Sequence, residues 1–146
     1  MKLAKAQEEM KTQYLLPERI VLQADAKNAA QLLAEQPRQA FLGDLPVCTL
    51  QKGGYVLLDF GCEFQGGADI VIQRTEHKED ALRLVFGESV SETMSSIGVH
   101  NAVNDHAPRD MTVSTGFLSH LCLGNTGYRF LKLEAVSGEI AVSSVQ

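Results

Sequence analysis

The feature that most constrains the fold is a series of short strand-like segments separated by glycines and polar turns, filling the chain from residue 53 onward. Glycine pairs stand at Gly53-Gly54 and Gly66-Gly67, and Gly61 lies between them. Short segments with glycine-rich turns are typical of a β-sandwich or jelly roll. The helical stretches of about 10–15 residues that a βαβ fold needs are missing between them. We therefore expect an all-β fold of mostly antiparallel strands, at residues 55–60, 68–73, 81–86, 111–115, 128–136 and 139–145.

The period-2 pattern of two segments supports this assignment. In residues 81–86, Leu82, Leu84 and Phe86 fall on one face and the intervening residues on the other. Residues 128–136 (YRFLKLEAV) show the clearest alternation of apolar and charged side chains. Both segments are expected to bury one face in a core.

The first 45 residues have a different composition, rich in Ala, Gln, Glu and Leu. Residues 27–35 (KNAAQLLAE) predict a short helix, which Pro37 ends. Residues 19–23 predict a short strand, and the preceding Pro17 favours the edge of a sheet. We expect an extension of residues 1–45 that packs on a β-sandwich of residues 46–146, the two forming one structural unit.

Size and charge exclude several classes of protein. A chain of 146 residues predicts one domain with a core of its own. The net charge of -5 argues against binding nucleic acid, which needs a basic face. The apolar runs are too short to span a membrane. Residues 1–11 are charged and show no apolar segment of a signal peptide, so the compartment stays open.

The three cysteines, Cys48, Cys62 and Cys122, are an odd number and contain no CxxC pair. This pattern predicts neither a disulfide framework nor a structural zinc site. We expect all three to be small buried side chains, and we expect no cofactor.

A long segment without a convincing strand, residues 87–109, interrupts the series of strands, and such a loop is usually functional or interacting. Residues 90–94 can form one helical turn with Glu88 near its cap. The segment runs into NDHAPRD, residues 104–110, which can contact sugar hydroxyls, dock against another domain, or simply form an ordered turn. The candidate contact residues are Asn104, Asp105, His106, Arg109, Asp110 and Glu88.

Other chemistries for this loop are weaker. Asp105, His106 and Asp110 offer too few oxygens for calcium, and zinc would want a further histidine or cysteine at a defined spacing, so we predict no metal site here. A hydrolase triad has no GxSxG motif to support it. Glu88 and Glu92 would share a face only in a helix. We therefore assign no catalytic residue.

Asp59 is an unusual residue for an apolar strand, since it lies between Leu58 and Phe60. A carboxylate at this position needs a partner if it is buried. We expect it on the solvent face, with Arg83 or Arg129 of a neighbouring strand as its partner.

Four stretches in this order carry a resemblance: GGYVLLDFGCEFQGG (53–67), LRLVFGESVSE (82–92), NDHAPRD (104–110) and GNTGYRFLKLE (124–134). Together with LLPERIVLQ (15–23), they resemble the N-terminal β-sandwich region of bacterial α-L-rhamnosidase-like glycoside hydrolases. The resemblance covers nearly the whole chain. It implies a multidomain enzyme in which an α/α barrel follows the sandwich and carries the catalytic acids that remove terminal rhamnose with inversion.

No residue here matches the barrel, so the resemblance transfers no catalytic carboxylate. It implies a non-catalytic accessory domain that supports a downstream catalytic barrel, in a parent family often exported from bacteria. The expected partners are that barrel and rhamnose-containing glycans, and an uncovered interdomain face would allow self-association. The alternative is a free-standing carbohydrate-binding module. The lack of tryptophan argues against tight lectin-like binding.

Overall fold

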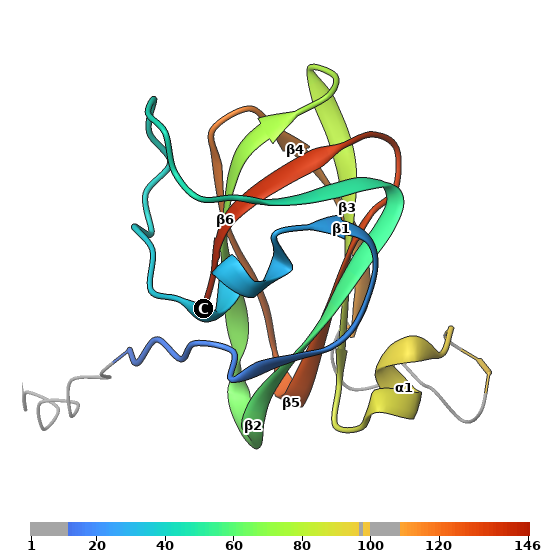
Figure 1. The fold of residues 1–146 in the computed structure, drawn as a ribbon. Coiled ribbons are helices and arrows are strands. Elements are labelled where there is room, and N and C mark those ends of the chain that lie inside the picture. Colours follow the sequence, from blue (N-terminus) through green and yellow to red (C-terminus); the bar gives the residue numbers. More distant parts are fainter. Residues whose placement is uncertain (1–11, 97, 100–108) are drawn as a thin grey trace, which may run out of the picture.

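The computed structural model describes residues 12–96, 98–99 and 109–146. It contains six strands and two short helices among these residues, which confirms the predicted all-β fold (Figure 1). The strands are β1 (Arg19–Lys27), β2 (Cys48–Thr75), β3 (Glu79–Gly87), β4 (Asp110–Gly116), β5 (Ser119–Ala135) and β6 (Ile140–Val145). The helices are η1 (Ala29–Leu33), a 3-10 helix, and α1 (Val90–Met94).

All strand pairings are antiparallel, and the hydrogen-bonded order is β1-β2-β5-β3-β4 with β6 also paired to β2. β2 runs to the lower end of the molecule, bends, and returns on the other side, and β5 follows it (Figure 1). One continuous sheet is thereby folded into two layers with the core between them. The described residues include no helix long and apolar enough to cross a membrane.

The bend joins two segments that the sequence predicts as separate strands. Residues 55–60 and 68–73 are the two arms of β2, and the pairing with β5 shifts register between Asp59 and Phe64 and again between Gly66 and Ala68. β5 likewise begins at Ser119 instead of Tyr128, because it continues beside the returning arm of β2. Such irregularities let one strand serve both layers.

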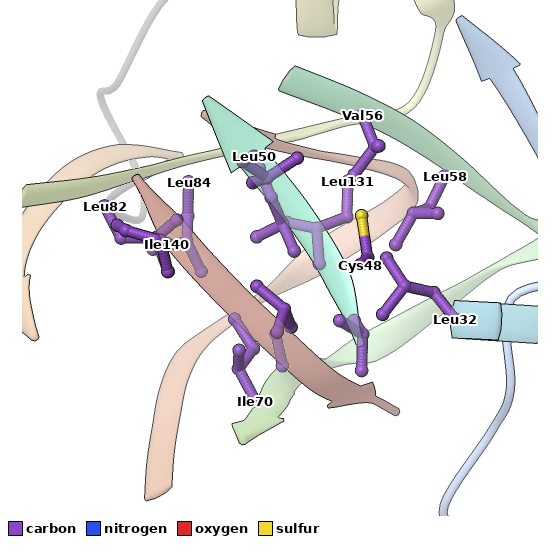
Figure 2. Close-up of a cluster of buried hydrophobic side chains, with 14 of the residues drawn as sticks. Leu32, Cys48, Leu50, Val56, Leu58, Ile70, Leu82, Leu84, Leu131 and Ile140 are labelled. Atoms are coloured by element: carbon purple, nitrogen blue, oxygen red, sulfur yellow. The ribbon is translucent and has the colours of Figure 1, made fainter. Parts of the chain in front are cut away.

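The core is a cluster of buried aliphatic and aromatic side chains from both layers (Figure 2). Leu82, Leu84 and Phe86 all belong to it, which confirms the predicted inner face of β3. Leu32 of η1 packs against it from the side, so the predicted helix in residues 27–35 exists as a shorter 3-10 turn. A fully buried leucine of this kind stabilises the fold by about 1.5–3 kcal/mol.

The prediction for the cysteines is right for one and wrong for two. Cys48 lies in the core, and burial raises the pKa of its thiol to about 11. Cys62 and Cys122 are exposed. Cys122 stands between Leu121 and Leu123, which pack on the core, so strand alternation turns its side chain outward.

The expected solvent exposure of Asp59 is also wrong, although one predicted partner is right. Its side chain is only 1% exposed because two arginines cover it. Arg129 contacts the carboxylate at 2.8 and 3.0 Å, and Arg19 of β1 contacts it at 2.7 and 2.8 Å. Arg83 pairs elsewhere.

Candidate functional site

The polar loop predicted from the sequence is described only at its ends. Asn104, Asp105 and His106 lie outside the described residues. Glu88 and Arg109 do come together, with Arg109 Nη2 at 3.2 Å from the Glu88 carboxylate. Arg109 also donates to the carbonyl of Gly127 in β5 at 3.0 Å. This pair links the end of β3 and the start of β4 to the bend of β5.

Asp110 makes a separate contact. It accepts hydrogen bonds from Arg83 at 2.6 and 2.9 Å, across the β3–β4 pair. Arg83 also lies 3.4 Å from Glu134, and the Asp110 carboxylate is its nearest anion. This arrangement is a cross-strand ion pair of the kind that stabilises a sheet.

The predicted helical turn is α1, and Glu88 lies next to its N-terminal cap, as expected, because the cap is Ser89. The Ser89 hydroxyl accepts from the amide of Glu92, and the Glu92 carboxylate accepts from the amide of Glu88 at 2.7 Å. This reciprocal pattern is a near relative of a capping box. The Glu92 carboxylate therefore stabilises the start of α1, and this structural role argues against a catalytic Glu88–Glu92 pair.

A pocket of about 540 Å³ opens at the lower end of the sandwich, where the two arms of β2 meet. Its volume lies within the range of roughly 300–1,000 Å³ that is common for small-molecule sites. Segments far apart in the sequence form it. Its lining comes from residues 12–15, from the β2 bend, from β5 and from the end of the chain: Thr12, Gln13, Tyr14, Leu15, Phe64, Gln65, Gly66, Gly67, Ala68, Asp69, Cys122, Leu123, Gly124 and Gln146.

The pocket combines an apolar wall with convergent polar groups. Tyr14 is 44% exposed, and the half-buried ring of Phe64 lines the same space. The guanidinium of Arg38 stacks 3.4 Å above the Tyr14 ring, which holds that aromatic in place. Gln65 and Asp69 are among the polar residues of the lining. Apolar rings beside directed polar groups suit a ligand with apolar faces and hydroxyl edges.

Close backbone packing forms the floor of the pocket. A side chain at Gly67 would bring a Cβ to 2.5 Å from the Gly124 carbonyl oxygen, so only glycine fits there. Gly124 itself has a φ of +85°, and a Cβ on it would lie 2.8 Å from the ring of Phe86. The buried Tyr128 hydroxyl donates to the Gly67 carbonyl at 2.8 Å and ties the floor to the core. Burial raises the pKa of this phenol well above its ordinary value.

Beneath this floor lies an aromatic cluster. Tyr128 contacts Phe64 with ring centroids 4.6 Å apart, and Phe86 at 4.8 Å. Phe60 completes the group, at 5.5 Å from Phe64 and 5.7 Å from Tyr128. Edge-on aromatic pairs of this kind are rigid and favourable. The pocket is therefore built on a well-packed base.

A second polar cluster consists of Asp69, His120 and Cys122, and it shares Asp69 and Cys122 with the lining of the pocket. His120 Nε2 lies 2.8 Å from one carboxylate oxygen of Asp69, and the Cys122 thiol donates to the other at 3.5 Å. Asp69 and Cys122 are directly opposite each other across the β2–β5 pair. The sequence signal was His120-x-Cys122, two residues that share one face of a strand, whereas a search for CxxC spacing misses it.

The geometry of this cluster is not that of a catalytic site in which His120 is the base that activates Cys122 as a nucleophile. In a catalytic triad the two imidazole nitrogens serve different partners. Here the same atom, His120 Nε2, faces both the Asp69 carboxylate and, at 3.8 Å, the Cys122 sulfur. Burial and the charge of Asp69 raise the pKa of the Cys122 thiol, which is the reverse of activation.

Comparison with known proteins identifies similar folds only among solved structures. No protein-family model matches the sequence, and no curated protein is significantly similar to it. A rhamnosidase from Klebsiella oxytoca with rhamnose bound matches with a TM-score of 0.60 and 18% identity, over 90% of this chain and 27% of that chain. The chain therefore spans about a quarter of that enzyme.

Two further solved structures match over almost their whole length. A lectin binding domain of lectinolysin, as a His 62 mutant complexed with Lewis b, has a TM-score of 0.54 and 10% identity, covering 92% of this chain and 94% of that one. A Streptococcus pneumoniae fucose binding module has a TM-score of 0.50 and 11% identity, covering 84% and 85%. At these identities the likeness concerns the fold. The chain has the β-sandwich fold that carbohydrate-binding modules share with a domain of a rhamnosidase.

Proposed function

We propose that the chain is a carbohydrate-binding module and that its ligand site is the pocket at the β2 bend. The observation that carries the proposal is the pocket itself, whose lining includes the aromatic residues Tyr14 and Phe64 and the polar residues Gln65 and Asp69. A sugar ring has an apolar face that packs on an aromatic ring and hydroxyls that take up hydrogen bonds. The structures similar in fold include proteins described as binding fucose and Lewis b, which supports a sugar as the ligand class.

The pocket predicts weak binding of a single sugar unit. One exposed tyrosine without tryptophan, together with a few polar groups, is consistent with about 4 kcal/mol, which corresponds to a dissociation constant of about 1 mM. Physiological affinity would then come from longer glycans or from several modules acting together. The deoxy sugars L-rhamnose and L-fucose are the first ligands to try, because similar structures are described with them.

Calorimetric titration of the full chain with these sugars, followed by glycan-array screening, tests the proposal. Replacing Tyr14 or Gln65 by alanine is expected to weaken binding at least about tenfold, which corresponds to about 1.4 kcal/mol. Gln23→Ala on the exposed surface of β1 is the matched control and should bind like the wild type. Equal binding by Gln65→Ala and Gln23→Ala would place the ligand elsewhere.

A second candidate function is support of a downstream catalytic barrel in an α-L-rhamnosidase-like hydrolase. Two observations favour it: the ordered sequence motifs and the likeness in fold to part of a rhamnosidase. In this hypothesis Glu88, Arg109 and Asp110, with Asn104, Asp105 and His106, form a contact to the barrel or to its substrate. The natural gene tests it directly, since a following region without paired helices would contradict the hypothesis.

The same hypothesis predicts an uncovered apolar surface. Phe41, Leu42 and Phe117 are exposed, and all three line one small hollow next to the turn between β4 and β5. Leu42 is 79% exposed. Light scattering on the purified chain would reveal self-association through this surface, and Leu42→Ser should reduce it. A monomer at all concentrations would argue against this part of the hypothesis.

A further inference from the structure

We propose that Asp69, His120 and Cys122, of which the first and the last also line the pocket, form a binding site for a divalent transition-metal ion of the zinc class. The proposal goes beyond sugar binding and does not depend on it. One ligand atom from each residue lies within 4.8 Å of the others. Each of the three side chains lies within hydrogen-bonding distance of the other two, so they form a closed cluster and not a chain.

The spacing of these atoms is close to that of a tetrahedral zinc site. Zinc bonds of about 2.0–2.3 Å to oxygen, nitrogen and sulfur place neighbouring ligand atoms about 3.3–3.6 Å apart. The observed distances are 2.8 Å between one carboxylate oxygen of Asp69 and the imidazole, 3.5 Å between the other carboxylate oxygen and the thiol, and 3.8 Å between thiol and imidazole. With a single carboxylate oxygen as ligand, the three ligand atoms lie within 4.8 Å of one another, so small side-chain movements bring them to the tetrahedral spacing.

The strands fix the three positions before any ion arrives. Cys122 is the direct cross-strand neighbour of Asp69, and His120 is the diagonal neighbour on the same face of β5. The backbone of Asp69 is also held by two 2.9 Å hydrogen bonds to Gln146, one in each direction. Metal binding to a site on paired strands loses less conformational entropy than binding to a site on a loop, because the ligands are already ordered.

The ligand types select the ion. Thiolate, imidazole and carboxylate are all zinc ligands, whereas calcium and magnesium prefer oxygen alone. Three protein ligands leave a fourth position for water or another ligand. Binding would release the Cys122 proton to the solvent, since the thiolate is the ligand. A divalent ion bound to the Asp69 carboxylate, the Cys122 thiolate and a neutral imidazole makes a neutral centre, and the nearby Arg38 favours the thiolate form of Cys122.

The test uses the untagged full chain in reduced form, titrated with Co²⁺ and no sugar. Thiolate coordination should give a sulfur-to-cobalt charge-transfer band in the near ultraviolet and d–d bands in the visible range, saturating at one ion per chain. Zn²⁺ should displace Co²⁺ and abolish these bands, and Ca²⁺ should not. Absence of the charge-transfer band at saturating Co²⁺ would overturn the proposal.

Variants locate the site, and the chain provides matched controls. Cys122→Ser should remove the charge-transfer band. His120→Ala should weaken binding by more than the roughly 10–100-fold that the loss of a supporting residue outside the coordination sphere costs. Cys62→Ser removes another exposed thiol, and His77→Ala removes a histidine that is paired with an aspartate but lies beside no cysteine. Both controls should bind like the wild type.

The outcomes separate the two proposals of function. Bands that survive in Cys122→Ser and vanish in Cys62→Ser would contradict the site. Circular dichroism shows whether each variant is folded. Because the titration contains no sugar, its failure would leave the carbohydrate proposal intact, and failure of sugar binding would leave the metal site intact.

Discussion

Replacing Asp59 by asparagine should destabilise the sandwich and change its response to acid. The carboxylate of Asp59 accepts from Arg19, from Arg129 and from the amide of Gly61. The arginines hold the pKa of this carboxyl well below its ordinary value of 3.8. It therefore stays ionised although its side chain is 1% exposed.

The magnitude follows from the bonds that asparagine can keep. The amide oxygen of asparagine can replace Oδ1 and keep accepting from the amide of Gly61 and from Arg129 Nε. The NH₂ group then replaces Oδ2, and it faces the N–H donors of both guanidinium groups, which lie 2.7–3.0 Å from Oδ2 in the wild type. Charge-assisted hydrogen bonds contribute roughly 1.5–3 kcal/mol each and are not additive. We expect Asp59→Asn to lose about 2–3 kcal/mol at pH 7, because both arginines keep access to water and are not left as buried unpaired charges.

The sign of the pH effect follows from the direction of the pKa shift. A carboxyl with a lowered folded-state pKa stabilises the fold above its unfolded value, and this stability is lost as the pH falls towards the folded value. The difference between wild type and Asp59→Asn should therefore be constant above about pH 5 and shrink below pH 3.8. Urea unfolding at several pH values measures it. A difference below about 0.5 kcal/mol at pH 7, or one that does not shrink in acid, would refute the reasoning.

Further predictions concern the pocket floor and the thiols. Tyr128→Phe should cost about 1 kcal/mol in urea unfolding, because it removes the hydroxyl that holds Gly67, and an unchanged stability would contradict that role. Gly124→Ala should lower the free energy of unfolding by about 2–4 kcal/mol, since its Cβ would meet the ring of Phe86. Gly53→Ala has a similar positive φ but open space around the added Cβ, so it should lower the free energy of unfolding by only about 1 kcal/mol. The exposed thiols of Cys62 and Cys122 should react with a disulfide reagent in the native protein, and the buried thiol of Cys48 should react only on unfolding.

Local patterns predict the strands well where one face is buried and the other is not. The alternation in residues 81–86 correctly predicts the inner face of β3, and the helix formers in residues 27–35 predict η1. The glycines were interpreted as turns between separate strands. In the structure Gly61, with a φ of +83°, lies at the bend within β2, because the ladder to β5 resumes beyond it. A glycine in the sequence is equally consistent with a bend inside one strand and with a turn between two strands, so the sequence does not distinguish them.

The candidate sites depend on register, which a single sequence does not contain. Asp69 meets Cys122 only because β5 extends back to Ser119, and that early arm of β5 lacks the strong alternation of residues 128–136. The pocket similarly joins residues 12–15 to the β2 bend and to Gln146. For Asp59 the sequence offers Arg83 or Arg129 as the partner, and Arg129 is correct. The contact with Arg19 depends on the pairing of β1 with β2, which the sequence alone does not predict.

The most direct test of the central claim is an ¹H–¹⁵N chemical-shift titration of the full chain with L-rhamnose and with L-fucose. The account predicts saturable shifts for at least one of them, concentrated in residues 64–69 and 122–124, which line the pocket. In Gln65→Ala the same shifts should be smaller at equal sugar concentration and should saturate only at a sugar concentration at least about tenfold higher. No saturable shift with either sugar or with the glycans selected by array screening, or shifts confined to residues 87–110, would contradict a carbohydrate site at the β2 bend.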